Sequence, residues 1–226
     1  MNSTFRRPRP SAGTRSPSTR STASFRSILV NPLSNRVVRT ESHLETKHAL
    51  TFMMRPDVLD VIEQHPRVEF IDHVGRLRSF TADICVTFVN GRRVAFAVKP
   101  LEKALKSGLR EMIGLIARQV PPSVVDAFAI ITEADVEPWQ YENAVLLYSA
   151  ARRGDLDAEA AEAVLAVAHT PISIGDIVGR TGMAGRAFRA IIALLAQAQF
   201  VLITKGRLTY ASIVAPSASP IREVAR

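Results

Sequence analysis

Residues 77–99 decide the fold, and they read LRSFTADICVTFVNGRRVAFAVK. The β-branched and aromatic residues in this stretch predict two strands, Leu77–Val89 and Arg93–Val98. Asn90-Gly91 between them is a strong signal for the turn of a β-hairpin. The stretch therefore predicts two antiparallel neighbours in one sheet.

The length of the hairpin loop decides which side chains share a face, because side chains alternate along a strand. A two-residue loop places Asp83 and Lys99 on opposite faces. A three-residue loop, Val89–Gly91, with the glycine in a bulge, pairs Asp83 with Ala97. Asp83, Ala97 and Lys99 then share one face, so a common site for Asp83 and Lys99 requires the longer loop.

The flanking sequence predicts helices and strands in an α/β layer arrangement. Thr40 and Ser42 are capping residues that predict a helix from about Glu41. The other expected elements are a short helix at Asp57–Gln64, a strand at Val68–Asp72, a helix at Leu101–Gln119 and a strand at Ala127–Thr132.

Three residues of this region form a candidate catalytic set. Asp83 interrupts an apolar run, although aspartate is disfavoured inside strands. Lys99 ends the next strand, and Glu45 lies on the first helix. Two acids and a lysine on adjoining elements are suited to metal-assisted hydrolysis of a phosphodiester, in which carboxylates hold Mg²⁺ and the lysine orients the nucleophile.

The order of short motifs resembles the endonuclease subunit of heteromeric DNA transposases, the TnsA-like family. That family shows a serine and a glutamate at the start of its first helix, then an Asp-Val and a Gln-Pro step, a Pro-Asp-Phe step, and a closing Glu/Gln-x-Lys. The matching positions here are Ser42 and Glu45, Asp57-Val58, Gln64 to Pro66, Ala82-Asp83-Ile84 and Ala97-Val98-Lys99. The resemblance covers residues 41–150 best.

The resemblance implies a restriction-endonuclease-like PD-(D/E)xK core that cuts DNA at transposon ends. It implies Mg²⁺ or Mn²⁺ held by Glu45, Asp83 and the Val98 carbonyl, with Lys99 near the scissile phosphate. The implied partners are DNA, a DDE-type transposase subunit and an AAA+ transposition regulator.

Ala97 departs from the family pattern, which has a glutamate or glutamine at this position. Three readings follow. The site cleaves DNA with water in place of the third ligand, or with Glu69 or Glu102 as a substitute ligand. The chain is instead a catalytically degenerate DNA-binding and assembly subunit. The third reading is a winged-helix regulator with an unrelated α/β domain.

The C-terminal part predicts a helical region with a winged-helix order of elements. The expected elements are helices at Tyr141–Arg152, Asp157–Ala168, Ser173–Arg180 and Ala184–Gln197, and strands at Phe200–Thr204 and Leu208–Ile213. Candidate DNA contacts are Arg186 and Arg189 on the last helix and Lys205 and Arg207 on the wing. The alternative is a basic face that docks a protein.

These patterns divide the chain into four parts: a disordered basic tail at 1–39, an endonuclease-like α/β domain at 40–153, a helical, winged-helix domain at 154–214 and a flexible C-terminus at 215–226. Residues 1–40 hold eight of the 29 basic residues and no acid, so this stretch carries the whole net charge of +8. Such a tail suits salt-sensitive phosphate contacts, although a solvated leader has the same composition.

Composition excludes other classes. Cys85 is the only cysteine, which excludes a disulfide framework and a cysteine zinc site. No apolar run approaches the length of a membrane span, so the sequence predicts a soluble, cytoplasmic protein that does not enter the membrane.

Overall fold

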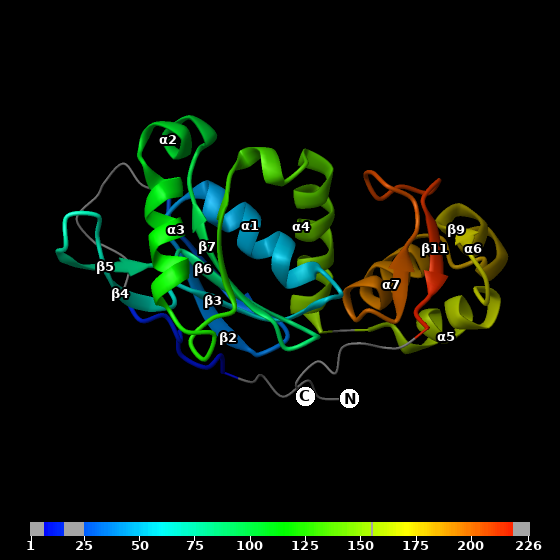
Figure 1. Ribbon diagram of the computed structural model, residues 1–226. Coiled ribbons are helices and arrows are strands. Elements are labelled where there is room, and N and C mark those ends of the chain that lie inside the picture. The colour runs from blue at the N-terminus through cyan, green and yellow to red at the C-terminus, as the bar shows by residue number, and fades with distance from the viewer. Residues whose placement is uncertain (1–6, 16–24, 155, 219–226) are drawn as a thin grey trace. The chain divides into compact units, whose positions relative to one another are not determined.

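A computed structural model describes residues 7–15, 25–154 and 156–218 of the chain. The protein is mixed α/β with several sheets, and its described residues hold seven α-helices (Figure 1). The chain forms two compact units, of which one spans Arg7–Glu137 and the other begins at Pro138. Within the described part, no helix is both long enough and apolar enough to cross a membrane.

The first unit is built on a four-stranded sheet in the order β3-β6-β7-β8. Its strands are β3 (Val58–Glu63), β6 (Ile84–Phe88), β7 (Arg93–Val98) and β8 (Ala127–Ile131). The pairs β3–β6 and β6–β7 are antiparallel, whereas β7 and β8 are parallel. A parallel pair needs a long crossover, and α2 (Leu101–Lys106) and α3 (Leu109–Gln119) lie in it.

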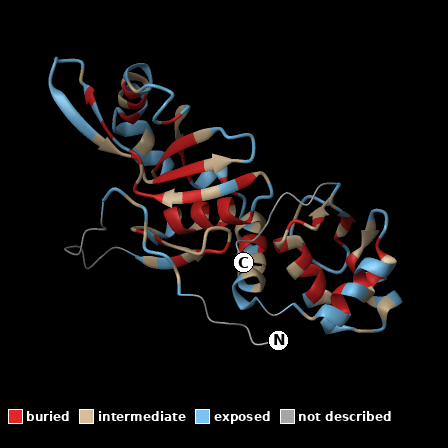
Figure 2. Cartoon of the chain, turned by 90° about the horizontal axis from the view of Figure 1, so that it is seen from below, coloured by how far each residue is buried: buried red, intermediate tan, exposed pale blue. Residues whose placement is uncertain are grey.

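Helices pack on both faces of this sheet. Phe96 of β7 stacks on Phe52 of α1 (His43–Met54), with ring centroids 5.0 Å apart. The next residue, Ala97, packs in a buried cluster with Leu109 and Ile116 of α3. Adjacent residues of β7 therefore face opposite helices, as the pleat requires. Figure 2 shows the buried residues concentrated in the strands and on the inner faces of the helices.

Two ribbons of two strands accompany the main sheet. They are β1 (Ser27–Asn31) with β2 (Arg36–Thr40), and β4 (Arg67–Ile71) with β5 (Leu77–Thr81). Asp60 of β3 anchors the first ribbon, because its carboxylate accepts from Arg36 at 2.8 Å and from Asn31 at 3.0 Å.

This first ribbon corrects part of the expectation of a disordered tail at 1–39, because residues 27–31 and 36–39 lie in strands. Residues 7–15 and the stretch from Phe25 onward have defined places in the fold, and order begins well before Thr40. The rest of the expected tail, residues 1–6 and 16–24, lies outside the described residues.

Three elements differ from the sequence-based expectation. Residues 58–63 form the strand β3 and not a helix, because Val58 and Val61 are fully buried and pair with β6. The expected strand Leu77–Val89 divides at Ala82-Asp83 into β5 and β6, which belong to different sheets. The expected helix Leu101–Gln119 divides at Gly108, whose φ of 62° is left-handed.

The second unit is mainly helical. Its elements are α4 (Pro138–Arg153), α5 (Ala158–Val167), β9 (Ile172–Ser173), α6 (Ile174–Thr181), α7 (Gly185–Ala196), β10 (Phe200–Leu202) and β11 (Ile213–Pro216). The strands form one sheet in the order β10-β11-β9. Leu147 and Ala150 of α4 pack against the buried hydrophobic core of this second unit. This unit therefore starts at Pro138, earlier than the boundary expected before Gly154.

Local signals placed the helices of this unit well. Ser173 caps α6 and accepts from the Asp176 amide at 3.0 Å, as its capping pattern predicts. The expected strand Leu208–Ile213 is wrong, since β11 begins only at Ile213. The Leu208 amide donates instead to the side chain of Asn143 on α4, at 2.9 Å. Of the expected flexible C-terminus, residues 219–226 lie outside the described part.

A short 3₁₀ turn, η1 (Glu133–Asp135), follows β8 and completes the elements of the first unit.

Candidate active site

Asp83 and Lys99 meet at one edge of the main sheet. Asp83 comes directly before β6, and Lys99 directly after β7. The Lys99 amine donates to Asp83 Oδ2 at 2.9 Å, and the Val98 amide donates to the same oxygen at 2.8 Å. Only 13% of the Asp83 side chain is exposed, so this carboxylate is held in place from two sides.

The hairpin loop makes this meeting possible. Ile84 pairs with Phe96, and Phe88 donates to the carbonyl of Arg92 at 2.8 Å. The loop is therefore the three residues Val89–Gly91, and Gly91 is left-handed with a φ of 82°. This confirms the longer of the two loops considered from the sequence, the one that a common site requires.

Glu45 is fixed at the start of α1. Ser42 is the N-cap and accepts from the Glu45 amide at 3.1 Å, while its hydroxyl donates to Glu45 Oε1 at 3.0 Å. The amide of Glu41 donates to Glu45 Oε2 at 2.8 Å. Both carboxylate oxygens are thereby oriented by hydrogen bonds at the start of α1.

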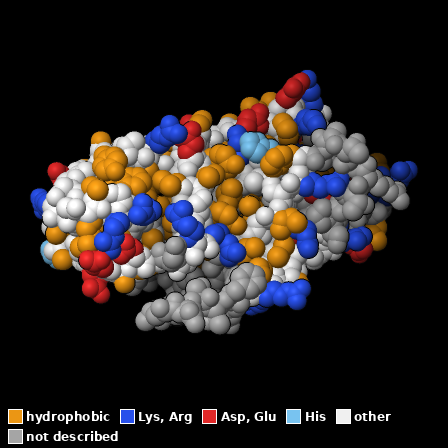
Figure 3. Space-filling model, turned by 180° about the vertical axis from the view of Figure 1, so that it is seen from behind, with side chains coloured by type: hydrophobic (Ala, Val, Ile, Leu, Met, Phe, Trp, Pro, Cys, Tyr) orange, Lys and Arg blue, Asp and Glu red, His pale blue; other side chains and the backbone are white. Residues whose placement is uncertain are grey.

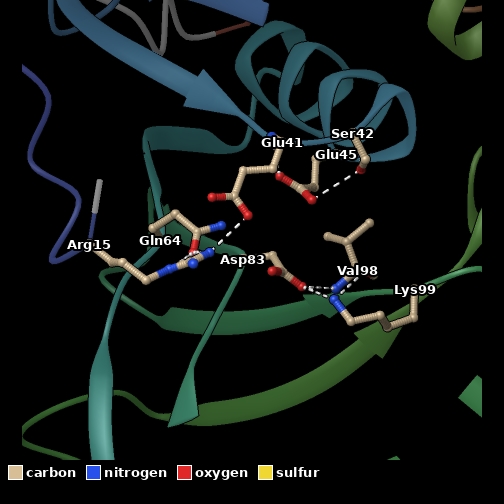
Figure 4. A network of polar contacts seen from close by, with 8 residues as sticks. All are labelled: Arg15, Glu41, Ser42, Glu45, Gln64, Asp83, Val98 and Lys99. Carbon is tan, nitrogen blue, oxygen red and sulfur yellow. Dashed lines mark hydrogen bonds and ion pairs between the residues drawn. The ribbon is translucent and has the colours of Figure 1, made fainter. Parts of the chain in front are cut away.

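Burial raises the pKa of Glu45 above its ordinary value, and the nearby charge of Asp83 raises it further. The hydrogen bond from the Glu41 amide and the charge of Lys99 act in the opposite direction. Glu45 thus lies within electrostatic reach of both Asp83 and Lys99 (Figure 4). Two carboxylates share this corner with one lysine, and a further cation would relieve their mutual repulsion.

The position of the missing acid is apolar. Ala97 is 1% exposed and packs with the α3 side chains. Across the described residues, no three His, Cys, Asp or Glu side chains come close enough together to hold a metal ion. Glu69 and Glu102 therefore do not complete a three-acid site with Glu45 and Asp83, and Glu102 instead pairs with Lys106 at 2.7 Å.

Three further polar residues, Arg15, Glu41 and Gln64, surround the site. Gln64 belongs to the motif order quoted from the sequence, and Glu41 is the alternative to Glu45 on the same predicted helix face. Arg15 was not expected here. Arg15 donates through Nε and Nη2 to Gln64 Oε1, at 3.0 and 2.7 Å, and through Nη2 to Glu41 Oε2 at 2.8 Å. The backbone amide of Gln64 in turn donates to the backbone carbonyl of Asp83 at 2.9 Å. Nothing in the sequence marks Arg15 among the eight arginines of its region, because its partners lie far along the chain.

The four candidate DNA contacts of the second unit have different surroundings. Arg186 donates to Asp157 at 2.7 and 3.0 Å and to Glu159 at 2.5 Å. Arg207 pairs with Glu142 at 2.9 Å. Arg189 lines a cavity of about 200 Å³ together with Arg153 and Asp157, and Lys205 is exposed in the loop between β10 and β11.

Two of the four candidates are therefore engaged by acids of their own unit. In the view of Figure 3, the basic side chains of the described residues lie in separate groups with apolar surface between them. Any nucleic-acid contact would rest on such local groups.

No protein-family model matches this chain, and no curated protein matches it either.

Proposed function

We propose that this chain is the metal-dependent DNA endonuclease subunit of a heteromeric transposase, and that it cleaves DNA at transposon ends. One observation carries the proposal. Asp83 and Lys99 stand at the ends of adjoining antiparallel strands, 2.9 Å apart, and the buried Glu45 is within electrostatic reach of both. This acid, acid and lysine set at one sheet edge is what phosphodiester hydrolysis needs.

The fold supports this reading in its order of elements. The succession of a helix, an antiparallel hairpin, a crossover with helices and a parallel strand is compatible with a PD-(D/E)xK core. The order α5, β9, α6, α7, β10, β11 is compatible with a winged helix, whose second helix would be α7. Arg189 and Lys205 would then contact phosphates.

The donor set fits a hard divalent cation. Glu45, Asp83 and the Val98 carbonyl would hold Mg²⁺ or Mn²⁺, since both prefer oxygen ligands and Mg²⁺ keeps several waters readily. The placement of Glu45 supports this fit, because its carboxylate is 6% exposed and lies within electrostatic reach of a second carboxylate, Asp83, and a cation between two carboxylates offsets their repulsion. When bound, the ion would polarise the phosphate and lower the pKa of a water.

The chain's own residues have separate roles in this proposal. The Lys99 amine, held by Asp83 and the Val98 carbonyl at 2.9 and 3.0 Å, would orient the attacking water and offset negative charge on the phosphate. Ser42 and the Glu41 amide would keep the Glu45 carboxylate turned to the site. The partners would be a DDE-type transposase subunit and an AAA+ regulator.

A second candidate function is a non-catalytic DNA-binding and assembly subunit of the same complex. The buried, apolar surroundings of Ala97 favour it, because the third side-chain ligand is missing and the described residues supply no other acid. Such a subunit would keep the fold and its DNA contacts without cleavage.

A nicking assay separates the two functions. The full chain, alone and together with a DDE-type transposase, is mixed with an end-labelled transposon end in the presence of Mg²⁺, Mn²⁺ or a chelator. We expect metal-dependent nicking by the wild-type chain and none by Lys99→Ala. The control variant is Lys103→Ala, at a lysine on α2 that follows Lys99 by four residues, and it should nick like the wild type. No nicking by the wild-type chain in any metal would contradict the enzyme and favour the assembly subunit.

A further inference from the structure

Residues 9–15 form a docked segment beside the candidate site. The amide of Arg9 donates to the Asn35 carbonyl at 2.7 Å, and its guanidinium donates to the Ser34 carbonyl. The Ser11 hydroxyl donates to Glu63 at 2.5 Å. Thr14 donates to the Gln64 carbonyl through its amide and its hydroxyl, at 2.9 and 2.6 Å. The segment is thus held at its start, middle and end.

Gly13 shows how closely this segment approaches β3. A Cβ built on Gly13 would lie 2.8 Å from the Glu63 carbonyl oxygen, a distance that carbon and oxygen do not tolerate without displacement. The segment therefore reaches its place only with a glycine there, which makes its course specific to this sequence.

The docked segment ends by placing one arginine at the site. Figure 4 shows Asp83 between Lys99 and the Arg15–Gln64 pair. The Arg15 guanidinium uses Nε and Nη2 for Gln64 and Glu41, and no bond of Nη1 is found among the described residues. Its side chain is 45% exposed. With respect to the described residues, donors of this guanidinium therefore remain available at the surface of the site.

Gln64 is organised to hold this arginine. It is 1% exposed and has a φ of 47°, which a residue with a Cβ rarely adopts. Because arginine can only donate, Gln64 must turn its oxygen toward Arg15. Its buried Nε2 then finds no partner among the described residues, which costs stability. Unsatisfied buried groups of this kind call for an explanation, and the orientation that Arg15 imposes on Gln64 supplies one.

We propose that Arg15 is a phosphate-binding residue of the candidate site and contacts the DNA backbone opposite Lys99. The inference rests on the proposed function and extends its substrate contacts. A planar guanidinium with exposed donors matches phosphate oxygens. Arg15 bonds to Glu41 and Gln64 and to neither Glu45 nor Asp83. It therefore does not neutralise the two candidate metal ligands and does not block the candidate site.

The first test measures cleavage of an end-labelled transposon end in Mg²⁺ or Mn²⁺ by the full chain with its partner transposase. Arg15→Ala should slow nicking by about 100-fold, as the loss of one donor to a developing charge does. Gly13→Val should have a similar effect, because it displaces the segment without removing charge. Arg15→Lys should restore part of the rate.

Arg55→Ala is the matched control. Arg55 is also 45% exposed and ion-paired, to Asp57 at 2.5 Å, but it caps the opposite end of α1. We expect its variant to nick at the wild-type rate. Nicking by Arg15→Ala that is equal to or faster than wild type would overturn the proposal and mark Arg15 as a structural or blocking residue.

The second test does not depend on cleavage. With Ca²⁺ in place of Mg²⁺, the affinity for the same duplex is titrated against salt. One lost phosphate contact should reduce the slope of log K against log salt by about 0.9 in Arg15→Ala, with no change in Arg55→Ala. An unchanged slope would overturn the phosphate contact. A reduced slope with a wild-type chain that never nicks would keep the contact and reject the nuclease.

Discussion

Each unit of this protein places an acid at the start of a helix, and the two acids have opposite electrostatics. Glu45 in the first turn of α1 is 6% exposed, and burial raises its pKa. Asp157 is the N-cap of α5, and its hydrogen bonds from Arg186 lower its pKa to about 2. The first acid lacks a full counter-charge, whereas the second already has one.

This difference separates a site from a structural contact. Asp157 and Arg186 satisfy one another at the surface and tie α5 to α7. Glu45 and Asp83 share Lys99 in a half-buried corner and leave negative charge that a cation or a cationic group could offset. An acid held in place without a full counter-charge is typical of a functional site, although structural networks can show the same pattern.

The largest expected effect is at Asp83. Asp83→Asn should reduce metal-dependent nicking by about a thousand-fold, since several kcal/mol of transition-state stabilisation are lost, while DNA affinity stays the same or rises. Asp72→Asn is the control, because Asp72 is likewise 13% exposed and pairs with Arg78 at 3.0 Å, but lies in the β4–β5 turn. Equal nicking by the two variants would show that Asp83 is not part of a site.

The next effect concerns the missing third acid. Ala97→Glu should lower the free energy of unfolding by roughly 3–5 kcal/mol, because it places a charge in the apolar cluster of α3. Urea denaturation followed by circular dichroism measures it, with the exposed Ala134→Glu as control. A stable Ala97→Glu variant that binds Mg²⁺ more tightly by calorimetry would instead show that the site has room for this ligand.

A smaller effect is the pH dependence of the first unit. The folded pKa of Glu45 is raised, so its contribution to stability is present below its ordinary value of 4.5 and is lost as pH rises through the folded pKa. In Glu45→Gln this decline should disappear. Hydrogen exchange of α1 amides, measured from pH 4.5 upward, reports it; identical profiles in the two proteins would contradict the raised pKa.

The smallest expected effect is the pH dependence of stability in the second unit, where stability is lost as pH falls and not as it rises. The pKa of Asp157 is lowered to about 2, so its contribution is present above 3.8 and is lost as pH falls toward 2. Asp157→Asn keeps an N-cap side chain and should flatten this loss in hydrogen exchange of α5 amides.

The same variant also tests whether Arg186 can bind DNA. Removing one of the two acids that pair with Arg186, while Glu159 remains, should steepen the salt slope of DNA affinity by up to about 0.9. Asp176→Asn is the control, because Asp176 accepts from Ser173 in the first turn of α6. An unchanged slope would mean that Arg186 does not face the DNA.

Much of the local structure could be predicted from the sequence. Ser42 and Ser173 predict the starts of α1 and α6, because an N-cap bonds to a residue only three positions further along the chain. The alternation along the strands limited Asp83 and Lys99 to two arrangements, one for each possible length of the hairpin loop. The three-residue loop with a left-handed Gly91 is the one that brings the two side chains together. These features depend on neighbours in the chain, which the sequence shows directly.

Other features could not be predicted because their causes are distant in the chain. Residues 58–63 became a strand through pairing with β6, and Ala97 became a core residue through α3. The division at Ala82-Asp83 reflects two competing sheets and not a local breaker. Strand assignment depends on such tertiary context more than helix assignment does.

By itself, the sequence determined the helix caps, the hairpin and the identity of the candidate residues Glu45, Asp83 and Lys99. Only the tertiary structure decided how charge is shared among them. It brought Arg15 to Gln64 and Glu41, and it matched Arg186 with Asp157 and Glu159. The physical reason is that an ion pair depends on distance and burial in space, whereas composition and periodicity report only neighbours along the chain.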